Sequence, residues 1–268
     1  MATISKIEVQ KKHHERFNLY IDGEFKAGIS IDTLVDFNLK KGDIVDDAQL
    51  KRILEREHQQ QANNDAINYL SHRKRTRHEI STHLERKDYS ESVIANAIAY
   101  CERLRLIDHE DYVESLKNTM LRTTDKGPEV FRQKLYKAGI EGSLLEAGVE
   151  QYKEEQSFEQ ICRVAQKIVH QKKGPVAKIR QQVQQSLMQK GYQMDTIHSV
   201  IEALDFQQDP EIIDNLLQRD LEKIYNKYQK RYNGYTLTMK TMEALVRKGY
   251  AYEDVQRKIR ESGIEDES

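Results

Sequence analysis

The chain contains an internal repeat, and this feature limits its possible folds more than any other. Four segments share one frame: a leucine is followed five residues later by tyrosine or isoleucine, and ten and fourteen residues later by two further aliphatic residues. The frame begins at Leu84, Leu135, Leu187 and Leu245, at intervals of 51, 52 and 58 residues. A period of this size indicates tandem supersecondary units, each too small to bury much apolar surface alone. Stacking of neighbours completes the cores, which predicts a mainly α-helical, elongated and curved array.

Each repeat is predicted to consist of a helix, a turn, a second helix, a turn and a longer helix. Gly139, Gly191 and Gly249 lie where the first helix must end, because glycine tolerates the left-handed conformation that such an end requires. Asp88 takes this place in the first repeat. The apolar pairs of each second helix are four residues apart, which places them on one face.

Local signals also mark the helix starts. Thr76 with the glutamate three residues later has the spacing of a capping box, and the segment from Ser157 to Gln160 has the same spacing. Pro128 and Pro175 each follow a glycine, and proline is tolerated at the first helical position. The longer helices are expected to begin near residues 108, 157 and 209.

The first fifty residues follow a different pattern. Residues 4–10 alternate between apolar and polar, as a half-buried strand does. Asp22 and Gly23 lie between two further alternating segments, which is a strong hairpin signal because both turn residues need positive φ. We therefore expect a small antiparallel sheet of about three strands. A short helix around residues 31–37 should follow, and Asp46 is a candidate N-cap for the next helix.

These patterns divide the chain into six parts. The connector is rich in Gln and Asn and is interpreted as a solvated helix, with a flexible linker as the alternative. The last repeat has no room for a third helix. The parts are a β-rich domain at 1–50, a helical connector at 51–65, three-helix repeats at 66–125, 126–173 and 174–233, and a truncated repeat with an acidic tail at 234–268.

The composition argues against several classes of protein. Charged residues make up 32% of the chain, but the net charge is −1. Acidic and basic residues are nearly equal in number in each of five consecutive segments, which are divided after residues 65, 128, 173 and 233. This balance argues against a strongly basic nucleic-acid binder. The two cysteines, Cys101 and Cys162, are far apart in helical patterns, so a disulfide is not expected. No apolar run approaches a membrane span. A cytosolic monomer without membrane contact is the expectation.

A search for catalytic and cofactor motifs finds none. The chain lacks phosphate-binding glycine loops, HExxH, CxxC and acidic calcium loops. His78 and His83 are five residues apart and do not share a helix face, so exposed histidines explain them better than a metal site does. We expect no enzyme, no metal and no cofactor. An enzyme whose mechanism cannot be read from the sequence is the alternative.

Two basic segments are the candidate binding sites. The first holds Arg73, Lys74, Arg75 and Arg77 beside Tyr69. The second interleaves basic residues with tyrosines, as in proteins where bases stack over a positive groove; its basic residues are Lys227, Lys230 and Arg231. Both segments can also be explained as ordinary solvated helix surfaces with half-buried tyrosines.

Two segments resemble the RecX family, bacterial regulators of the recombinase RecA. The first runs from Leu70 through Arg75-Thr76 and Glu79-Ile80 to Leu84 and Lys87; the second is Leu106-Ile107-Asp108 with Asp111 and Tyr112. His109 and Val113 depart from the Asp and Ala usual in the family. The likeness covers roughly residues 66–262, and the N-terminal hairpin is similar to the extension of longer members from Gram-positive bacteria.

The resemblance implies a non-enzymatic protein that binds the RecA–DNA filament and restrains recombinase, ATPase and co-protease activities. It carries over no catalytic residues. Two other hypotheses stay open: a module that binds single- or double-stranded DNA directly through the two basic segments, and a general scaffold for other proteins.

Overall fold

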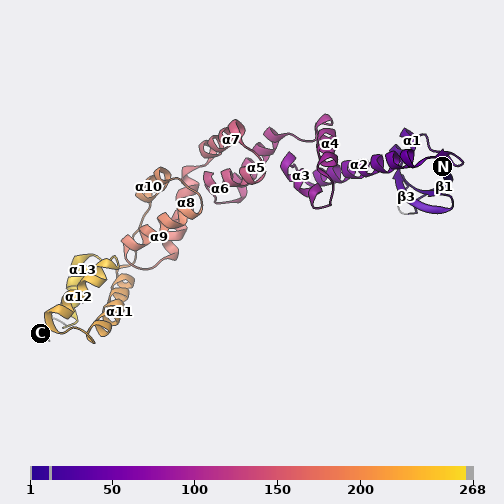
Figure 1. The fold of residues 1–268 in the computed structure, drawn as a ribbon. Coiled ribbons are helices and arrows are strands. Elements are labelled where there is room, and N and C mark those ends of the chain that lie inside the picture. The colour runs from indigo at the N-terminus through magenta and orange to yellow at the C-terminus, as the bar shows by residue number, and fades with distance from the viewer. Residues whose placement is uncertain (1, 12–13, 264–268) are drawn as a thin grey trace. The chain divides into compact units, whose positions relative to one another are not determined.

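The computed structural model describes residues 2–11 and 14–263, and these residues form thirteen helices and four strands (Figure 1). They divide into two compact units. One unit holds residues 2–114 together with 135–141, and the other holds 115–134 together with 142–263. The prediction of a mainly helical protein with a small N-terminal antiparallel sheet is confirmed. The acidic tail expected at the C-terminus lies at 264–268, outside the described residues.

The N-terminal sheet has four antiparallel strands in the order β3-β2-β1-β4. The strands are β1 (Ala2–Val9), β2 (Arg16–Ile21), β3 (Glu24–Ser30) and β4 (Ile44–Val45). The predicted hairpin turn joins β2 and β3, with Asp22 at φ 50° and Gly23 at φ 87°. The two-residue strand β4 was not predicted, because a strand that short carries no period.

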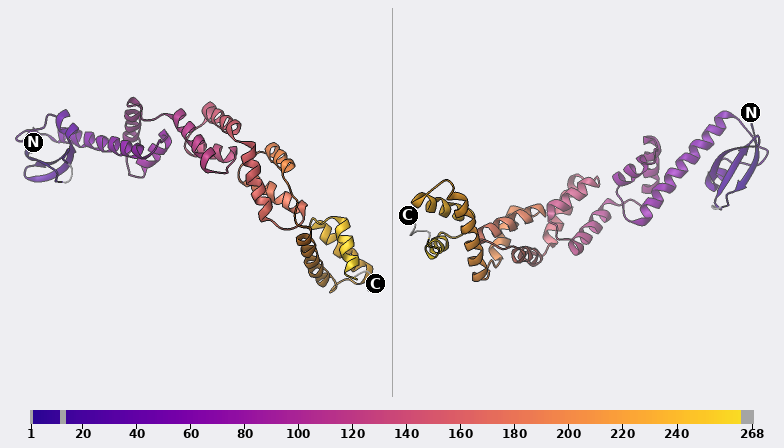
Figure 2. Two further views of the ribbon diagram at one scale, coloured as in Figure 1. Left: turned by 180° about the vertical axis from the view of Figure 1, so that it is seen from behind. Right: turned by 90° about the horizontal axis from the view of Figure 1, so that it is seen from below.

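Two helices connect this sheet to the rest of the chain. Helix α1 (Ile31–Asp36) is short, and α2 (Asp47–His72) is one uninterrupted helix in every view (Figures 1 and 2). Asp46 caps α2 as predicted, since its carboxylate accepts a hydrogen bond of 2.6 Å from the backbone N–H of Gln49. The connector is therefore helical rather than a flexible linker.

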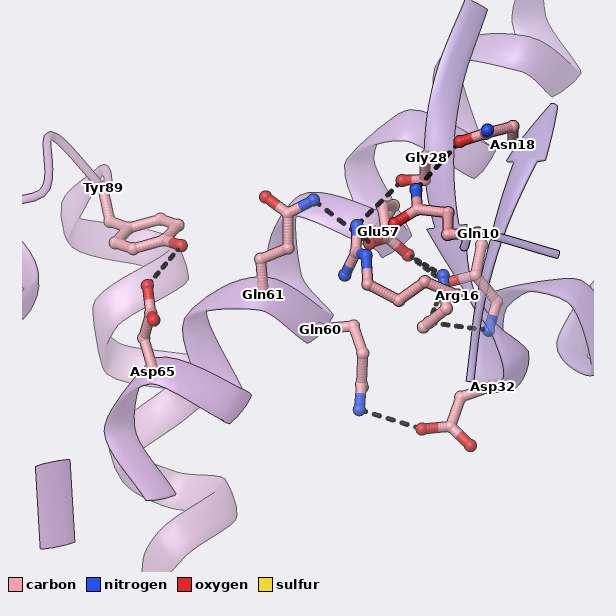
Figure 3. Close-up of polar contacts among 12 residues, drawn as sticks. Gln10, Arg16, Asn18, Gly28, Asp32, Glu57, Gln60, Gln61, Asp65 and Tyr89 are labelled. Atoms are coloured by element: carbon pink, nitrogen blue, oxygen red, sulfur yellow. Dashed lines mark hydrogen bonds and ion pairs between the residues drawn. The ribbon is translucent and has the colours of Figure 1, made fainter. Parts of the chain in front are cut away.

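A buried carboxylate attaches the sheet to α2 (Figure 3). Glu57 is only 3% exposed and accepts four hydrogen bonds. Its donors are the Arg16 guanidinium at 2.9 Å, the Ser30 backbone N–H at 2.7 Å, the Thr33 hydroxyl at 3.0 Å and the Gln61 amide at 3.1 Å. A buried charge is stable only when it is paired and hydrogen-bonded, and this one joins β2, the end of β3, α1 and α2.

Eleven further helices follow α2. They are α3 (Arg77–Glu85), α4 (Glu91–Arg103), α5 (His109–Thr123), α6 (Pro128–Lys137), α7 (Gly142–Glu155), α8 (Phe158–Gln171), α9 (Val176–Gln189), α10 (Met194–Ala203), α11 (Pro210–Tyr228), α12 (Gly234–Arg247) and α13 (Tyr252–Glu261). The capping box at Thr76 is present, whereas the Ser157 side chain makes no cap hydrogen bond. Spacing alone therefore predicted one of the two boxes.

Clusters of buried residues hold many of the described helices together, and each of the following clusters joins one helix to the two helices that come after it. One joins α2, α3 and α4, a second joins α8, α9 and α10, and a third joins α11, α12 and α13. The sequence instead predicted that α8 and α11 each end a repeat together with the two helices before them. The repeat frame begins at a leucine of the first short helix, so it shows the period but not which helix opens a unit.

Within the described ranges, no helix is long and apolar enough to cross a membrane. Cys101 is buried and Cys162 half-buried, and both are free thiols. Burial raises the pKa of each thiol, with a smaller contribution from a neighbouring glutamate. A raised thiol pKa lowers the thiolate fraction, which makes both side chains less reactive than an ordinary cysteine.

Candidate interaction surfaces

Each glycine turn packs against the start of a first helix one repeat earlier. A Cβ atom on Gly191 would lie 2.8 Å from the backbone nitrogen of Val130, and one on Gly139 would overlap the Cβ of His78. A Cβ on Gly249 would lie 3.3 Å from the Cβ of Pro175. The same contact therefore occurs at the starts of α3, α6 and α9. These glycines have φ of 75° to 102°, so both the backbone conformation and the close approach require glycine.

Hydrogen bonds accompany the contacts at α6 and α3. The backbone N–H of Gly127 donates to the carbonyl of Lys190 at 2.7 Å, and that of Glu129 donates to the carbonyl of Gly191 at 3.1 Å. At α3 a side chain makes the bond, because the Thr76 hydroxyl donates to the carbonyl of Ala138 at 2.5 Å. Backbone carbonyls of these two turns thus find partners in the neighbouring repeat.

A lysine, a tyrosine and an aspartate meet at three of the four turns. Lys87 and the Tyr89 hydroxyl both contact Asp65, at 2.7 and 2.9 Å. Lys248 and Tyr250 contact Asp220 in the same way, at 2.5 and 2.7 Å. At the third turn Lys190 pairs with the Asp125 carboxylate, while Tyr192 donates to the Asp125 backbone carbonyl at 3.2 Å. In the second repeat alanine and isoleucine replace the lysine and tyrosine.

These contacts change the ionisation of their members. Burial, reinforced by the hydrogen bond to Asp65, raises the pKa of Tyr89 to about 12. Burial likewise raises the pKa of Tyr192 and of Tyr250. The hydrogen bond from Lys190 lowers the pKa of Asp125. Sequence reasoning missed these groups, because the aspartates lie 22 to 65 residues away from the lysines. The lysine and tyrosine shared by three turns were the only available signal.

The first basic segment is largely compensated inside the protein. Arg73 pairs with Glu79 at 2.6 Å, Lys74 pairs with Asp111 at 2.5 Å, and Arg77 pairs with Glu102. These pairs join the loop after α2, and the start of α3, to α4 and α5. These three cations are therefore already engaged in ion pairs within the protein.

Arg75 and His109 also have structural roles in this segment. The Arg75 guanidinium lies 4.0 Å from the centre of the Tyr69 ring, and Tyr69 stacks on His83 with 3.9 Å between ring centres. His109 accepts a hydrogen bond of 3.1 Å from the backbone N–H of Arg77, so it caps α3. Burial lowers the pKa of His109, which favours the neutral ring that can accept this bond.

The second basic segment is less compensated. Lys227, Lys230 and Arg231 are exposed at the end of α11, and among the described residues none of them pairs with a carboxylate. The Lys227 ammonium lies 5.8 Å from the Tyr228 ring centre, and Tyr228 meets Tyr232 edge to face at 6.0 Å. The end of α11 therefore combines aromatic rings with cations that have no carboxylate partner among the described residues.

The described side chains include no group of three or more His, Cys, Asp or Glu residues that could hold a metal ion. His78 is exposed, with its Cβ close to Gly139, and the His83 ring stacks on Tyr69. Burial lowers the pKa of His83, with smaller contributions from nearby cations.

Family models match both the sheet and the helical units. The model for the Regulatory protein RecX N-terminal domain matches residues 2–46, and that for the first three-helix domain of RecX matches 62–101. The model for the third three-helix domain matches twice, at 154–201 and 213–259. These two matches coincide with α8 to α10 and α11 to α13, the same groups that the buried clusters define.

Relatives match over their full length. The chain is 56% identical to the regulatory protein RecX of Staphylococcus carnosus over 100% of both chains, and 54% identical to that of Staphylococcus haemolyticus over the same share. A crystal structure of regulatory protein RecX matches with a TM-score of 0.60 at 30% identity, covering 76% of this chain and 100% of the other. The structure of RecX from Lactobacillus salivarius matches with a TM-score of 0.51 at 31% identity, over 56% and 98%. The chain belongs to the RecX family of non-enzymatic regulatory proteins.

Proposed function

We propose that the protein binds the RecA–DNA filament in the cytoplasm and inhibits its recombinase, ATPase and co-protease activities, thereby modulating DNA repair and recombination. The observation that carries this proposal is the full-length match to regulatory proteins named RecX, at 52 to 56% identity. The structure supports a binding role, because the helical part consists of small modules with separate cores. Several weak contacts distributed over such modules would add by multivalency along a filament.

The end of α11 is the better candidate for a filament contact than the loop before α3. Lys227, Lys230 and Arg231 carry charges that no carboxylate of the described chain neutralises, whereas Arg73, Lys74 and Arg77 are paired within the protein. A paired cation must break its own ion pair before it can bind a partner, which weakens the new contact. We therefore propose that the α11 segment binds the filament and that the first segment chiefly holds α3, α4 and α5 together.

Hydrolysis of ATP by RecA on single-stranded DNA tests the proposal. Addition of the protein should lower the rate, and lack of effect at stoichiometric excess would count decisively against filament inhibition. The variant Lys227→Gln/Lys230→Gln/Arg231→Gln should require several-fold more protein for the same inhibition, with unchanged helix content by circular dichroism.

A matched variant separates the two segments. Arg73→Gln/Lys74→Gln/Arg77→Gln removes the same charge but also breaks three internal ion pairs. It should lower the melting temperature while inhibition by the remaining folded protein is preserved. Loss of inhibition without loss of stability would instead assign the filament contact to the first segment. Failure to capture RecA at all would favour a scaffold for other proteins.

A further inference from the structure

Helices α8 and α9 carry a run of basic residues that does not show in the net charges of the five segments compared in the sequence. Between Glu159 and Asp195 the chain has 35 residues without a single carboxylate, and these include seven lysines and arginines and nine glutamines. The division after residue 173, used above to compare charges, cuts this run in two, and each half is balanced by acidic residues outside it. The net charge of the segments therefore gives no sign of the run.

Two of the seven cations are used by the fold. Lys190 pairs with Asp125, and the Arg180 guanidinium lies 4.3 Å from the centre of the Phe206 ring. The other five are exposed, and none has a carboxylate partner in the part of the chain that the structure describes. These five, here called the α8–α9 basic surface, are Arg163, Lys167, Lys172, Lys173 and Lys178.

The helix geometry places these cations away from the buried faces of α8 and α9. Ile161, Ala165 and Val169 bury the inner face of α8, so Arg163 and Lys167, four residues apart, lie on the opposite face. The loop lysines follow directly after α8, and Lys178 lies in the first turn of α9. Figure 1 shows α8 and α9 beside each other within the same unit.

Helix stability does not explain this arrangement. Lys172 follows the last residue of α8, where the helix dipole favours a cation, but Lys178 lies at the positive end of α9, where the dipole disfavours one. Five uncompensated charges within sixteen residues also repel one another. Arginine and lysine elsewhere in this protein commonly meet a carboxylate, as Arg132 meets Glu146. A surface whose cations have no carboxylate partner among the described residues is therefore suited to a ligand that supplies the negative charge.

We propose that the α8–α9 basic surface binds the phosphate backbone of double-stranded DNA. Lysine, arginine and glutamine side chains all donate hydrogen bonds to phosphate oxygens. From Arg163 to His170 the helix rises about 10 Å, which spans roughly three phosphates of one duplex strand. The run contains a single aromatic residue, Tyr192, and it is buried, so the surface offers no ring on which an unpaired base could stack. Such a surface contacts phosphates alone, and duplex DNA has the higher charge density.

The lack of exposed aromatic rings distinguishes the α8–α9 basic surface from the end of α11. There tyrosines accompany the cations, which is the arrangement that binds single strands by stacking. The inference does not depend on recombinase inhibition, because it concerns DNA without any other protein. It can hold if filament inhibition fails, and it can fail if inhibition holds.

Fluorescence anisotropy of a labelled duplex with the full-length protein tests the inference. The variant is Arg163→Gln/Lys167→Gln/Lys172→Gln/Lys173→Gln. The control Lys26→Gln/Lys40→Gln/Lys41→Gln/Arg52→Gln removes the same charge from exposed residues of the other unit that have no carboxylate partner. At about 50 mM salt the variant should bind at least about tenfold more weakly, and its plot of log affinity against log salt should be shallower by about 3 to 4, one phosphate per cation. The control should bind like the wild type.

Several results would overturn the inference. These are absence of duplex binding by the wild type at low salt, equal losses in variant and control, or tighter binding of single strands than of duplex. Retained DNA binding with loss of binding to DNA-free recombinase would show that the surface meets an acidic protein instead. If the fourfold variant is poorly folded, Lys172→Gln/Lys173→Gln changes only residues outside the helices and should still lose part of the affinity.

Discussion

At the scale of single residues, Gly191 has two independent reasons to be glycine. Its φ is 87°, and a Cβ atom would lie 2.8 Å from the Val130 nitrogen and 2.9 Å from a Val130 methyl carbon. Gly142 also has positive φ, at 63°, but no atom lies within 4 Å of the position of its Cβ. The comparison separates the cost of backbone conformation from the cost of the contact between repeats.

Gly191→Ala should therefore destabilise the protein more than Gly142→Ala does. A left-handed alanine costs about 1–2 kcal/mol at either site, and displacement of the packed neighbour should add about 1–3 kcal/mol at Gly191 alone. Urea unfolding measured by circular dichroism gives both values. Equal losses of stability would show that the turn does not need its close approach to α6.

At the scale of elements, Glu57 is the main polar connection between the sheet and α2. Its carboxylate accepts bonds from β2, the end of β3 and α1, so one side chain fixes the sheet on the helix. Nothing in the local sequence marks this glutamate among the others of a Gln-rich helix. Its partners come from residues 16 to 33, and only the folded chain brings them together.

Glu57→Gln should cost about 2–4 kcal/mol, because a neutral amide leaves the Arg16 guanidinium without an anionic partner and its NH2 group faces a donor that the carboxylate accepted from. Hydrogen exchange should accelerate in β2, β3 and α1, while α8 to α10 stay protected. Glu55→Gln is the control, since Glu55 is exposed and its pair with Lys51 is 3.8 Å long, so its effect should stay within about 0.5 kcal/mol. Similar effects of both changes would contradict the role assigned to Glu57.

At the scale of the whole molecule, the three turn tyrosines give the protein a shared sensitivity to alkali. Tyrosine ionises near pH 10 in an unfolded chain, whereas the pKa of Tyr89 is raised to about 12 in the folded protein, and those of Tyr192 and Tyr250 are also raised. Between these values the unfolded chain has lost protons that the folded chain keeps. Stability should therefore be complete below about pH 10 and fall as the pH rises toward 12.

Urea midpoints measured from pH 8 upward test this expectation. The wild type should lose stability steeply above about pH 10. The variant Tyr89→Phe/Tyr192→Phe/Tyr250→Phe should start from a lower stability and decline less steeply, because its phenylalanines cannot ionise. Parallel curves would show that the three hydroxyls are not responsible.

The sequence by itself determined the features that depend on local sterics and short spacing. Positive φ at Asp22, Gly23 and Asp88, the Asp46 cap and the Thr76 capping box all follow from a few neighbouring residues, and the structure has each of them. The repeat frame likewise predicted helical modules, because periodic apolar positions must be buried. The predicted capping box at Ser157 is absent, because spacing alone does not determine whether a side chain turns toward the helix or toward solvent.

Tertiary structure alone decided which distant groups meet. It paired Lys190 with an aspartate 65 residues away, and it joined α8 and α11 each to the two helices that follow. It also neutralised the basic segment at 73–77 but left the α11 segment and the α8–α9 basic surface without carboxylate partners among the described residues. The physical reason is that charge and contact energies depend on distance in space. A count of charges along the chain does not contain these spatial distances.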